Sequence, residues 1–295
     1  MNNFEKIFWI ASYPKSGNTW VRLILCGIFF TKDGSLDNLK ILDQIPKFDT
    51  FKNYKFIKNH SLNDYHKIFD QNIYNEDAQL TLAKYWIEAQ KNIINKKNNL
   101  NFFKTHNARL RFKDYYYTNQ ITSLGFIYVI RDPRDIVMSY SKWKNNNIED
   151  TVNFLVSNNI MGTQNTKNRM PEFIYNWKDH YQSWKNFIKV PNLFIKYEDL
   201  LNDIDYEINR IIDFFYQNYN IKIENKNNKI KNIINSTKFI NLKNIESENG
   251  FIEKSEHTSF FRKGEKNQWK NKLTKNHLDL IQKCFEKEMI QLKYI

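Results

Sequence analysis

A lysine and two hydroxyl residues surround a glycine close to the start of the chain. The segment Ser12–Trp20 reads Ser-Tyr-Pro-Lys-Ser-Gly-Asn-Thr-Trp and follows the apolar run Ile7–Ala11. A second apolar run comes directly after it, so the pattern predicts a strand, a tight loop and the start of a helix. Backbone N–H groups at a helix N-terminus bind anions, and Lys15, Ser16 and Thr19 add further hydrogen-bond donors there. The segment therefore predicts a phosphate-binding loop.

This loop departs from the G-x-x-x-x-G-K-[ST] pattern of ATP-binding loops. Gly17 and Thr19 fit that pattern. Asn18, however, stands where the lysine belongs, and Ser12 replaces the first glycine. The lysine is Lys15, two residues before the glycine, so we expect it to approach the phosphate chain from the strand side of the loop. An ordinary ATPase is therefore disfavoured, and Thr19 does not by itself imply a magnesium ligand.

A second candidate anion site follows the apolar run Phe126–Ile130. Arg131 is expected at the tip of this strand, and Ser139 a little over one turn into the following helix. Ligand-binding groups gather at the carboxyl ends of parallel strands, so a guanidinium group and a hydroxyl group here can hold one phosphate. The residues between them also fit a capped helix with charge pairs four residues apart. Both interpretations stay open on the residues alone.

Two further segments carry residues suited to chemistry. Arg262, Lys263 and Gly264 form a run with two cations and a flexible glycine, although such a run is also common on surfaces. His106 follows Lys104 at the end of a predicted strand. A histidine with a pKa near 6.5 can act as a general base near neutral pH, and a lone histidine can equally be structural.

In their order along the chain, these segments resemble the sulfotransferases that use 3′-phosphoadenosine 5′-phosphosulfate (PAPS). The 5′-phosphosulfate loop of that family reads Y-P-K-S-G-[TN]-[TS]-W, as does Tyr13–Trp20 here. The 3′-phosphate motif R-[DN]-P-[RK]-D-x-x-x-S-x is similar to residues 131–140, and R-K-G-x-x-G-[DN]-W-[KR] to residues 262–270. The last match departs at Asn267, usually glycine, and at Gln268, which leaves the turn geometry there open. The resemblance covers nearly the whole chain.

The resemblance implies which residues bind PAPS. The first loop would hold the 5′-phosphosulfate, and Arg131, Ser139 and the Arg-Lys-Gly run would hold the 3′-phosphate. Aromatic side chains would pack on the adenine, among them the tyrosine of a Tyr-Glu-Asp-Leu segment. The implied set comprises Lys15, Ser16, Gly17, Asn18, Thr19, Trp20, Arg131, Ser139, Tyr197, Thr237, Phe239, Arg262, Lys263 and Gly264.

The resemblance also implies three catalytic residues. His106 would take the proton from the acceptor's hydroxyl or amine group as that group attacks sulfur. Lys104 would stabilise charge on the transferring sulfuryl group, and Lys15 charge on the departing phosphate oxygen. Adenosine 3′,5′-bisphosphate (PAP) would be released. Lysines and helix-end amides can supply the stabilisation that magnesium gives to kinases, so no metal is expected.

Other positions differ from the family pattern or are assigned to packing. The usual proline two residues after the histidine is Ala108, which indicates a different acceptor. Lys275 and Asp279 replace two residues of a family dimer motif, so dimerisation by that route is not expected. His180 lies on an amphipathic helix and is assigned to packing. Candidate walls of the acceptor pocket, which could equally fill the core, are Phe48, Phe51, Tyr65, Trp86 and Trp143.

Composition sets broad limits on the class of protein. The chain has 295 residues, 41% of them apolar and 16% aromatic, which predicts one globular domain over residues 1–295. Lys and Arg exceed Asp and Glu by 13, so the surface attracts anions, although Asn/Lys-rich solvated faces explain much of this charge. Cys26 and Cys284 lack metal-ligand spacing and are expected to be core thiols in a reducing compartment. No run approaches about 20 apolar residues, so we expect a cytoplasmic protein without a membrane segment.

Four apolar runs separated by helix-length segments predict a parallel sheet. They are Ile7–Ala11, Asn101–Lys104, Phe126–Ile130 and Leu193–Lys196. The expected helices are 19–30, 76–95, 134–145, 172–188 and 206–216, while 145–170 and 239–261 are expected to be loops. The alternation predicts the α/β class, and the resemblance implies a P-loop-like three-layer fold with a central, mainly parallel sheet flanked by helices.

Sulfuryl transfer from PAPS to a small-molecule or glycan acceptor is the preferred interpretation. A nucleotide-dependent phosphotransferase is one alternative, but that class needs a glycine-lysine pair where Asn18 stands. A non-catalytic, basic nucleic-acid-binding protein is another, suggested by the net charge. Nucleic acid is not an expected partner under the preferred interpretation. The sequence leaves the acceptor and the oligomeric state open.

Overall fold

The computed structural model describes residues 5–55, 76–94, 100–161 and 169–295. Within it the chain forms two compact units. Unit 1 contains residues 1–13, 47–128 and 157–192, and unit 2 contains residues 14–46, 129–156 and 193–295. Each unit is described by itself, and the expectation of a single domain stays a prediction.

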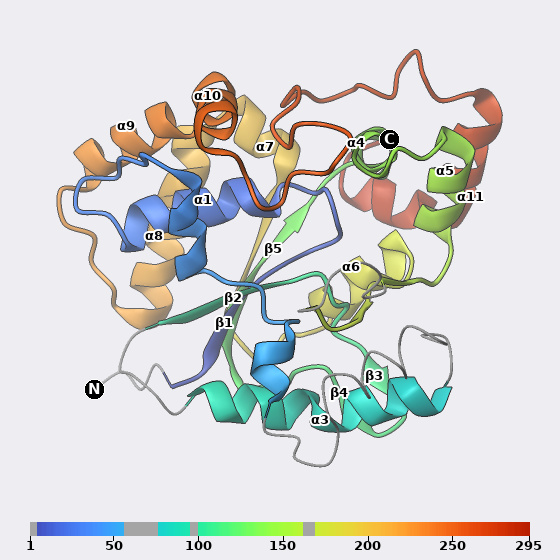
Figure 1. Ribbon diagram of the computed structural model, residues 1–295, viewed down its shortest axis with the longest axis horizontal. Coiled ribbons are helices and arrows are strands. Elements are labelled where there is room, and N and C mark those ends of the chain that lie inside the picture. The colour runs from blue at the N-terminus through green and yellow to red at the C-terminus, as the bar shows by residue number, and fades with distance from the viewer. Residues whose placement is uncertain (1–4, 56–75, 95–99, 162–168) are drawn as a thin grey trace. The chain divides into compact units, whose positions relative to one another are not determined.

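The main sheet has four strands in the order β2-β1-β5-β8. They are β1 (Ile7–Ser12), β2 (Asn101–Thr105), β5 (Ser123–Ile130) and β8 (Asn192–Lys196). β1 and β2 pair in parallel, with Ala11 opposite Thr105 (Figure 1). Every residue of β1 is buried, as expected for a parallel strand covered on both faces. All four predicted strands are therefore confirmed, and so is the α/β class with its central, mainly parallel sheet flanked by helices.

Unit 1 surrounds its strands with one long helix and several short elements. The helix α3 (Glu76–Ile94) packs against the short helix η2 (Phe51–Tyr54) and against β4 (Figure 1). Edge-to-face aromatic pairs fill the core, with Phe48 beside Trp9 and Trp86 beside Tyr117. The remaining elements are β3 (Arg111–Phe112), β4 (Tyr115–Tyr116), β6 (Ile160–Met161), β7 (Glu172–Phe173) and α6 (Trp177–Lys185).

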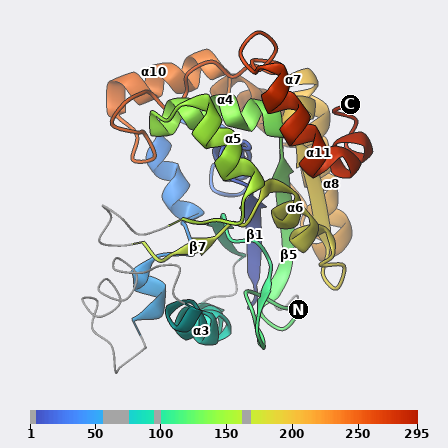
Figure 2. The same cartoon turned by 90° about the vertical axis from the view of Figure 1, so that its right-hand side faces the viewer.

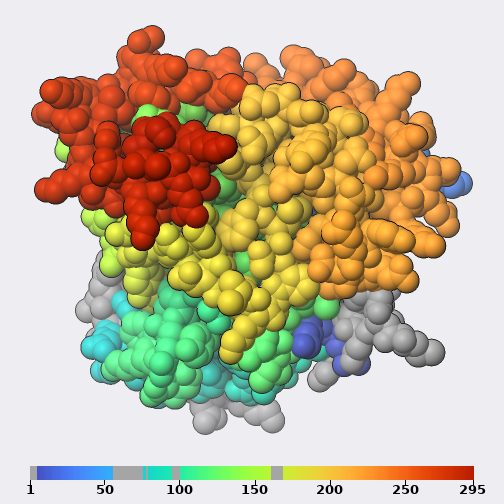
Figure 3. Space-filling model, turned by 180° about the vertical axis from the view of Figure 1, so that it is seen from behind, coloured from blue at the N-terminus to red at the C-terminus, as the bar shows by residue number. Residues whose placement is uncertain are grey.

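Unit 2 holds most of the helices that the structure describes. Helix α1 packs against α9 and η1, and α11 packs against α4 and α5 (Figure 2). Figure 3 shows the exposed surface that α8 and α9 form in yellow to orange. The elements are α1 (Asn18–Phe29), η1 (Leu39–Gln44), α4 (Pro133–Lys144), α5 (Ile148–Val156), α7 (Tyr197–Asn202), α8 (Ile204–Tyr219), α9 (Lys226–Ser236), α10 (Phe239–Asn249) and α11 (Lys275–Gln291).

Three sequence-based expectations about helices and loops are wrong. The predicted helix over residues 172–188 begins only at Trp177, because Glu172–Phe173 form β7 and Asn176 caps the helix by accepting from the Asp179 N–H at 2.8 Å. The expected loops over residues 145–170 and 239–261 contain α5 and α10. Helix α10 has only two buried residues, Leu242 and Glu246, so its periodicity is weak, whereas α5 is a short helix of nine residues with Val152 and Leu155 buried on one face.

One of the two cysteines differs from the expectation of core thiols. Cys26 is buried, and burial raises the pKa of its thiol to about 12, whereas Cys284 is partly exposed, so the expectation is wrong for Cys284. Asp203 caps α8 by accepting from the Tyr206 N–H at 3.0 Å. Across the described ranges, no helix combines the length and the apolar character needed to cross a membrane.

Candidate active site

Each strand of the main sheet leads directly into a predicted site residue. β1 is followed by the loop of Lys15, β2 by His106, β5 by Arg131 and β8 by Tyr197. The predicted PAPS-binding residues lie in unit 2, whereas Lys104 and His106 lie in unit 1. The two groups are described within their own units.

The phosphate loop of unit 2 requires glycine at position 17 for two reasons. Gly17 immediately precedes α1 and has a φ of 104°, in the left-handed region that favours glycine. A Cβ atom at this position would lie 2.6 Å from a ring carbon of Tyr197. Lys15 also has a positive φ of 67°. The loop backbone is thus held in a tight turn that presents the N-terminus of α1.

The side chains of this loop present several donors. The hydroxyl oxygen of Ser16 is buried and has no hydrogen-bond partner among the described residues. The Thr19 hydroxyl donates to Glu253 at 2.8 Å, and the same carboxylate accepts from Arg22 at 2.7 Å. The ammonium group of Lys15 lies 4.3 Å from the centre of the Phe260 ring. Part of the loop is therefore engaged by residues of the C-terminal region.

Arg131 joins three segments of unit 2. Its Nη1 donates to the carbonyl of Lys15 at 3.2 Å, and its Nη2 donates to the carbonyl of Glu265 at 3.0 Å. Its guanidinium carbon lies 4.1 Å from the centre of the Tyr197 ring. Its Nε is buried and has no partner within the described ranges. Ser139 lies on α4 and is partly exposed. The guanidinium group thus borders the phosphate loop, and its Nε–H is unused among the described residues.

The residues after Arg131 also form a capped helix, the other interpretation of this motif. Asp132 caps α4 by accepting from the Arg134 N–H at 2.9 Å. The Arg134 guanidinium pairs with the same carboxylate at 2.7 Å and lies 4.0 Å from the centre of the Trp269 ring. This pair leaves the side chain of Arg131 outside the cap, so the cap and an anion site can coexist.

The C-terminal cationic segment keeps its turns despite its departures from the family pattern. Asn267 has a φ of 62°, and asparagine is one of the few residues besides glycine that tolerate this region. Its N–H donates to Asp135 at 2.7 Å. Gln268 accepts from Arg262 at 2.9 Å. Gly264 has a φ of 67°, and a Cβ atom there would lie 2.3 Å from the Phe239 ring.

The predicted adenine-side residues lie in unit 2 as follows. Trp20 and Tyr197 meet edge to face, with ring centroids 5.7 Å apart. Phe239 packs against Gly264, as the close approach above requires. Thr237 is buried, and its hydroxyl donates to the carbonyl of Ile233 at 2.7 Å. The hydroxyl proton of Thr237 is therefore bound within the protein, and its oxygen lone pairs remain to accept a hydrogen bond from a ligand.

In unit 1, the hydrogen bonds of His106 define its tautomer. Its Nδ1 lies 2.8 Å from the carbonyl oxygen of Ser12, the last residue of β1. A carbonyl oxygen can only accept, so Nδ1 carries the proton and Nε2 keeps its lone pair. The Ser12 hydroxyl lies 3.3 Å from the same nitrogen. The arrangement makes Nε2 the basic nitrogen of the ring.

The surroundings of His106 keep its ring neutral. Burial, together with the positive charges of Lys104 and Lys47, lowers the pKa of His106 to about 3, although Glu172 acts in the opposite direction. Lys104 is itself buried, and it is the second-last residue of β2, two positions before His106. The ring of His106 is therefore neutral, with an unprotonated Nε2, throughout the neutral pH range.

Two buried carboxylates, which the sequence did not single out, hold the backbone around His106. The His106 N–H donates to Glu172 at 3.0 Å, and Glu172 forms an ion pair with Lys47. Burial raises the pKa of Glu172, but the charge and hydrogen bond of Lys47 act with the charge of Lys104 to lower it below its usual range. Asp49 accepts from Thr105 and from Asn107, each at 2.7 Å. These acids lie more than 50 positions from their partners, so no sequence spacing could have revealed them.

The aromatic candidates for the acceptor pocket divide into two kinds. Phe48 and Trp86 have no exposed surface and fill the core of unit 1, where Phe51 is also buried. Trp143, in unit 2, is partly exposed, and its ring centre lies 5.2 Å from the Lys15 ammonium group. Tyr65 lies outside the described residues.

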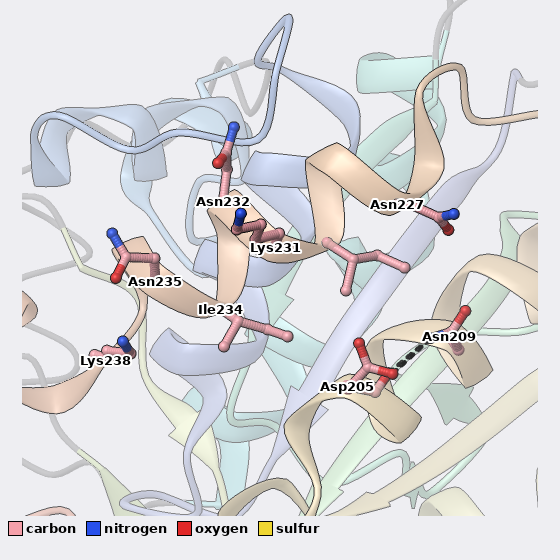
Figure 4. Close-up of a pocket in the computed structure, with 9 residues that line it drawn as sticks. Asp205, Asn209, Asn227, Lys231, Asn232, Ile234, Asn235 and Lys238 are labelled. Atoms are coloured by element: carbon pink, nitrogen blue, oxygen red, sulfur yellow. Dashed lines mark hydrogen bonds between the residues drawn. The ribbon is translucent and has the colours of Figure 1, made fainter.

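A surface groove of unit 2 lies apart from these residues. It is formed by α8 and α9 and contains none of the predicted site residues (Figure 4). Asp205 and Asn209 of α8 hydrogen-bond to one another at 3.2 Å on its wall. Within the ranges that the structure describes, no three His, Cys, Asp or Glu side chains cluster as metal ligands.

Similarity over the full length of the chain identifies the family. Residues 5–293 match the model of the sulfotransferase domain. The protein therefore belongs to the sulfotransferase family, as the order of its motifs predicted.

Similar proteins from a plant and from humans are also sulfotransferases. The chain is 24% identical to cytosolic sulfotransferase 6 of Arabidopsis thaliana, covering 95% of this chain and 80% of that protein. It is 25% identical to human sulfotransferase 1E1, covering 95% and 82%. A crystal structure of retinol dehydratase with androsterone and the inactive cofactor PAP superposes with a TM-score of 0.58 at 18% identity, covering 98% of this chain and 81% of that one. This last similarity confirms the fold.

Proposed function

We propose that this protein transfers a sulfuryl group from PAPS to a hydroxyl or amine group of an acceptor. One observation carries the proposal: the carbonyl of Ser12 fixes the proton of His106 on Nδ1 and leaves Nε2 as the base. His106 directly follows β2, which pairs in parallel with β1, and β1 leads into the lysine-bearing phosphate loop. A base and an anion-binding loop are the two parts that this reaction needs.

The residues of unit 2 fit the two charged ends of PAPS. The buried Ser16 hydroxyl and the N-terminus of α1 suit a 5′-phosphosulfate, and the buried Arg131 Nε suits a 3′-phosphate. Arg262, partly exposed, and Lys263, exposed, add positive charge to the second group. When bound, PAPS supplies the sulfuryl group and a phosphate leaving group. A metal is not part of the proposal.

The proposed reaction moves one proton to His106 and one sulfuryl group to the acceptor. His106 Nε2 takes the acceptor's proton while the acceptor oxygen or nitrogen bonds to sulfur and the bond from sulfur to the phosphate oxygen breaks. Lys104 stabilises the charge on the sulfuryl oxygens during this exchange. Lys15 stabilises the negative charge that develops on the departing phosphate oxygen. The proton ends on His106 and the sulfuryl group on the acceptor.

Lys15 has to exchange its aromatic contacts for the phosphate in this proposal. Its ammonium group rests on the rings of Phe260 and Trp143. Such cation–π contacts are worth about 0.5–2 kcal/mol each, whereas a buried charge-assisted bond to a phosphate oxygen is stronger. The exchange is therefore favourable, and the two rings keep Lys15 close to the loop until the phosphate binds.

The similar proteins support the proposal at the level of reaction class. The Arabidopsis and human relatives are named sulfotransferases, and the retinol dehydratase structure contains PAP. A cytoplasmic location is part of the proposal, supported by the name of the Arabidopsis relative. The acceptor is proposed as a small molecule or a glycan, because the androsterone bound to retinol dehydratase is a small molecule.

An acceptor screen tests the proposal. Purified protein is incubated with radiolabelled PAPS and separate pools of phenols, lipid alcohols, amines and glycans. We expect label to move to at least one pool, with release of PAP in equal amount. Failure to label any pool, with PAPS left intact, would contradict the proposal.

Calorimetry separates the proposal from its two alternatives. We expect PAP to bind and ATP with magnesium to bind weakly, and we expect substitution of Lys15 or Arg131 by alanine to weaken PAP binding. Preference for ATP with magnesium would indicate a phosphotransferase. Salt-sensitive binding of nucleic acid that survives loss of both residues would indicate the basic binding protein.

A further inference from the structure

We infer that His180 is a positioning residue for His106, which it holds through a hydrogen bond to the backbone. The sequence assigned His180 to packing alone. The inference rests on the proposed function, in which His106 is the base. Both residues belong to unit 1, as do all their partners considered below.

A chain of two hydrogen bonds fixes the state of His180. Its Nε2 lies 3.0 Å from the carbonyl oxygen of His106, so Nε2 carries a proton and donates it. Its Nδ1 then has a lone pair, which accepts from the hydroxyl of Tyr128 at 2.8 Å. The ring has no exposed surface, and burial lowers the pKa of His180 to about 4. It is therefore a neutral donor with one defined tautomer.

His106 is consequently held at three points. Glu172 accepts from its backbone N–H, His180 donates to its carbonyl, and Ser12 accepts from its ring Nδ1–H. Together these bonds fix the peptide plane on each side of the residue and the orientation of the ring. The direction of the Nε2 lone pair follows from them. His180 differs from the other two partners because it has two tautomers. Tyr128 sets which of them is present, and so determines that His180 donates to the His106 carbonyl.

Packing adds to the hydrogen bonds around His180. Its ring meets the Tyr13 ring edge to face, with centroids 5.5 Å apart, and lies 5.7 Å from the Tyr128 ring. Tyr13 follows Ser12 directly in the sequence. His180 thus contacts His106 itself and also Tyr13, the residue next to the Ser12 carbonyl that orients the His106 ring. Misplacement of a reacting group by about 1 Å can cost about 10²-fold in rate, so this restraint affects catalysis.

Two amide variants of His180 test the inference. A glutamine amide lies as many bonds from Cα as Nε2 does, and an asparagine amide as many as Nδ1. We therefore expect His180→Gln to keep the donor to the His106 carbonyl and most of kcat. We expect His180→Asn to lose that donor and to lower kcat by about 10²-fold, with an unchanged dissociation constant for PAP.

Ser183→Ala is the matched control. Ser183 lies on the same helix, and its hydroxyl accepts from the backbone N–H of Arg109 at 2.8 Å, a similar bond three residues further from the base. The same hydroxyl donates to the backbone carbonyl of His180 at 2.7 Å, so the substitution leaves both hydrogen bonds of the His180 ring in place. We expect its kcat to stay close to that of the wild type. The inference is overturned if His180→Asn and His180→Gln have equal kcat values, or if Ser183→Ala is as slow as His180→Asn.

A spectroscopic measurement needs no acceptor. In protein labelled with ¹⁵N at its six histidines, we expect His106 to be in the Nδ1–H form in the wild type and in His180→Gln. In His180→Asn, we expect both tautomers to be populated, since the backbone that aligns the ring with Ser12 is released. An unchanged tautomer in His180→Asn overturns the inference. Absence of sulfuryl transfer by the wild type contradicts the proposed function instead, so the two failures are distinguishable.

Discussion

At the scale of single residues, the chemistry depends on which nitrogen of His106 holds the proton. The Ser12 carbonyl decides this, because it accepts a hydrogen bond and cannot donate one. The sequence singled out the histidine as a candidate base by its place at the end of a predicted strand and by the family resemblance, and its role as the base stays a proposal. It could not reveal Glu172, Asp49 or His180 as its supports, because those contacts join positions more than 50 residues apart.

The low pKa of His106 has a consequence for stability. Its pKa is about 3 in the folded protein and near 6.5 in an unfolded chain, so below pH 6.5 protons bind the unfolded chain preferentially. Acid therefore favours unfolding at this residue. Relative to His106→Asn, we expect the wild type to lose about 1.4 kcal/mol of unfolding free energy per pH unit between about pH 6 and pH 4.

Urea unfolding of both proteins at several pH values measures this difference. His180 and the carboxylates titrate in both proteins and largely cancel in the comparison. A difference that does not change with pH would show that the ring is already protonated in the folded protein, contrary to the account.

Lys15 provides a second prediction at this scale. We expect Lys15→Ala to lower kcat by about 10²–10³-fold, since it removes one preorganised charge from the departing oxygen. PAP binding weakens less, because the backbone N–H groups of α1 and the Ser16 hydroxyl remain. Steady-state kinetics and PAP titration measure the two effects separately. A loss of PAP affinity with an unchanged kcat would assign Lys15 to binding alone.

At the scale of elements, the turns before and after helices present the site. Gly264 and Gly250 offer a matched pair, with φ values of 67° and 70°. A Cβ atom at Gly264 would meet the Phe239 ring at 2.3 Å, whereas one at Gly250 has nothing within 4 Å. Alanine at either position carries a backbone cost of about 1–3 kcal/mol. Only Gly264→Ala also displaces an aromatic side chain of the proposed adenine site.

We therefore expect Gly264→Ala to weaken PAP binding and Gly250→Ala to leave it unchanged. Calorimetric titration of both variants with PAP, alongside thermal unfolding, tests this expectation. Equal PAP affinity in the two variants would remove Phe239 from the proposed site.

The strands were easier to predict than several helices, for a physical reason. A buried parallel strand is a short, continuous apolar run, as in β1, and the sequence shows it directly. Helix α9 has only Ile230 and Ile233 buried within a stretch rich in Asn and Lys, and α10 has only Leu242 and Glu246. Their helical state depends on packing against α1 and η1, which composition does not reveal.

At the scale of the whole molecule, motif order carried more information than any single motif. The cap formed by Asp132 and Arg134 shows that the segment after Arg131 serves structure as well as a possible anion site. The order of matched segments from Tyr13 to Trp269, together with Asn18 where a P-loop kinase has its lysine, favours a sulfotransferase over a phosphotransferase. The match of residues 5–293 to the sulfotransferase domain confirms that order-based prediction.

The net charge of +13 leads to a prediction about association. A positive field accelerates the approach of an anionic nucleotide, and added salt screens it. We expect the association rate of PAP to fall from low to high ionic strength, while its dissociation rate changes less. Stopped-flow measurements at several salt concentrations test this. An association rate independent of salt would show that the excess positive charge does not accelerate PAP binding and serves solubility alone.

The central claim is that His106 is the base for sulfuryl transfer from PAPS. The most direct measurement is single-turnover transfer of labelled sulfate to the best acceptor from the screen, by the wild type and by His106→Ala. General bases contribute about 10²–10⁴-fold, so we expect a loss of that size in His106→Ala with PAP binding intact. Transfer at the same rate by both proteins would contradict the account.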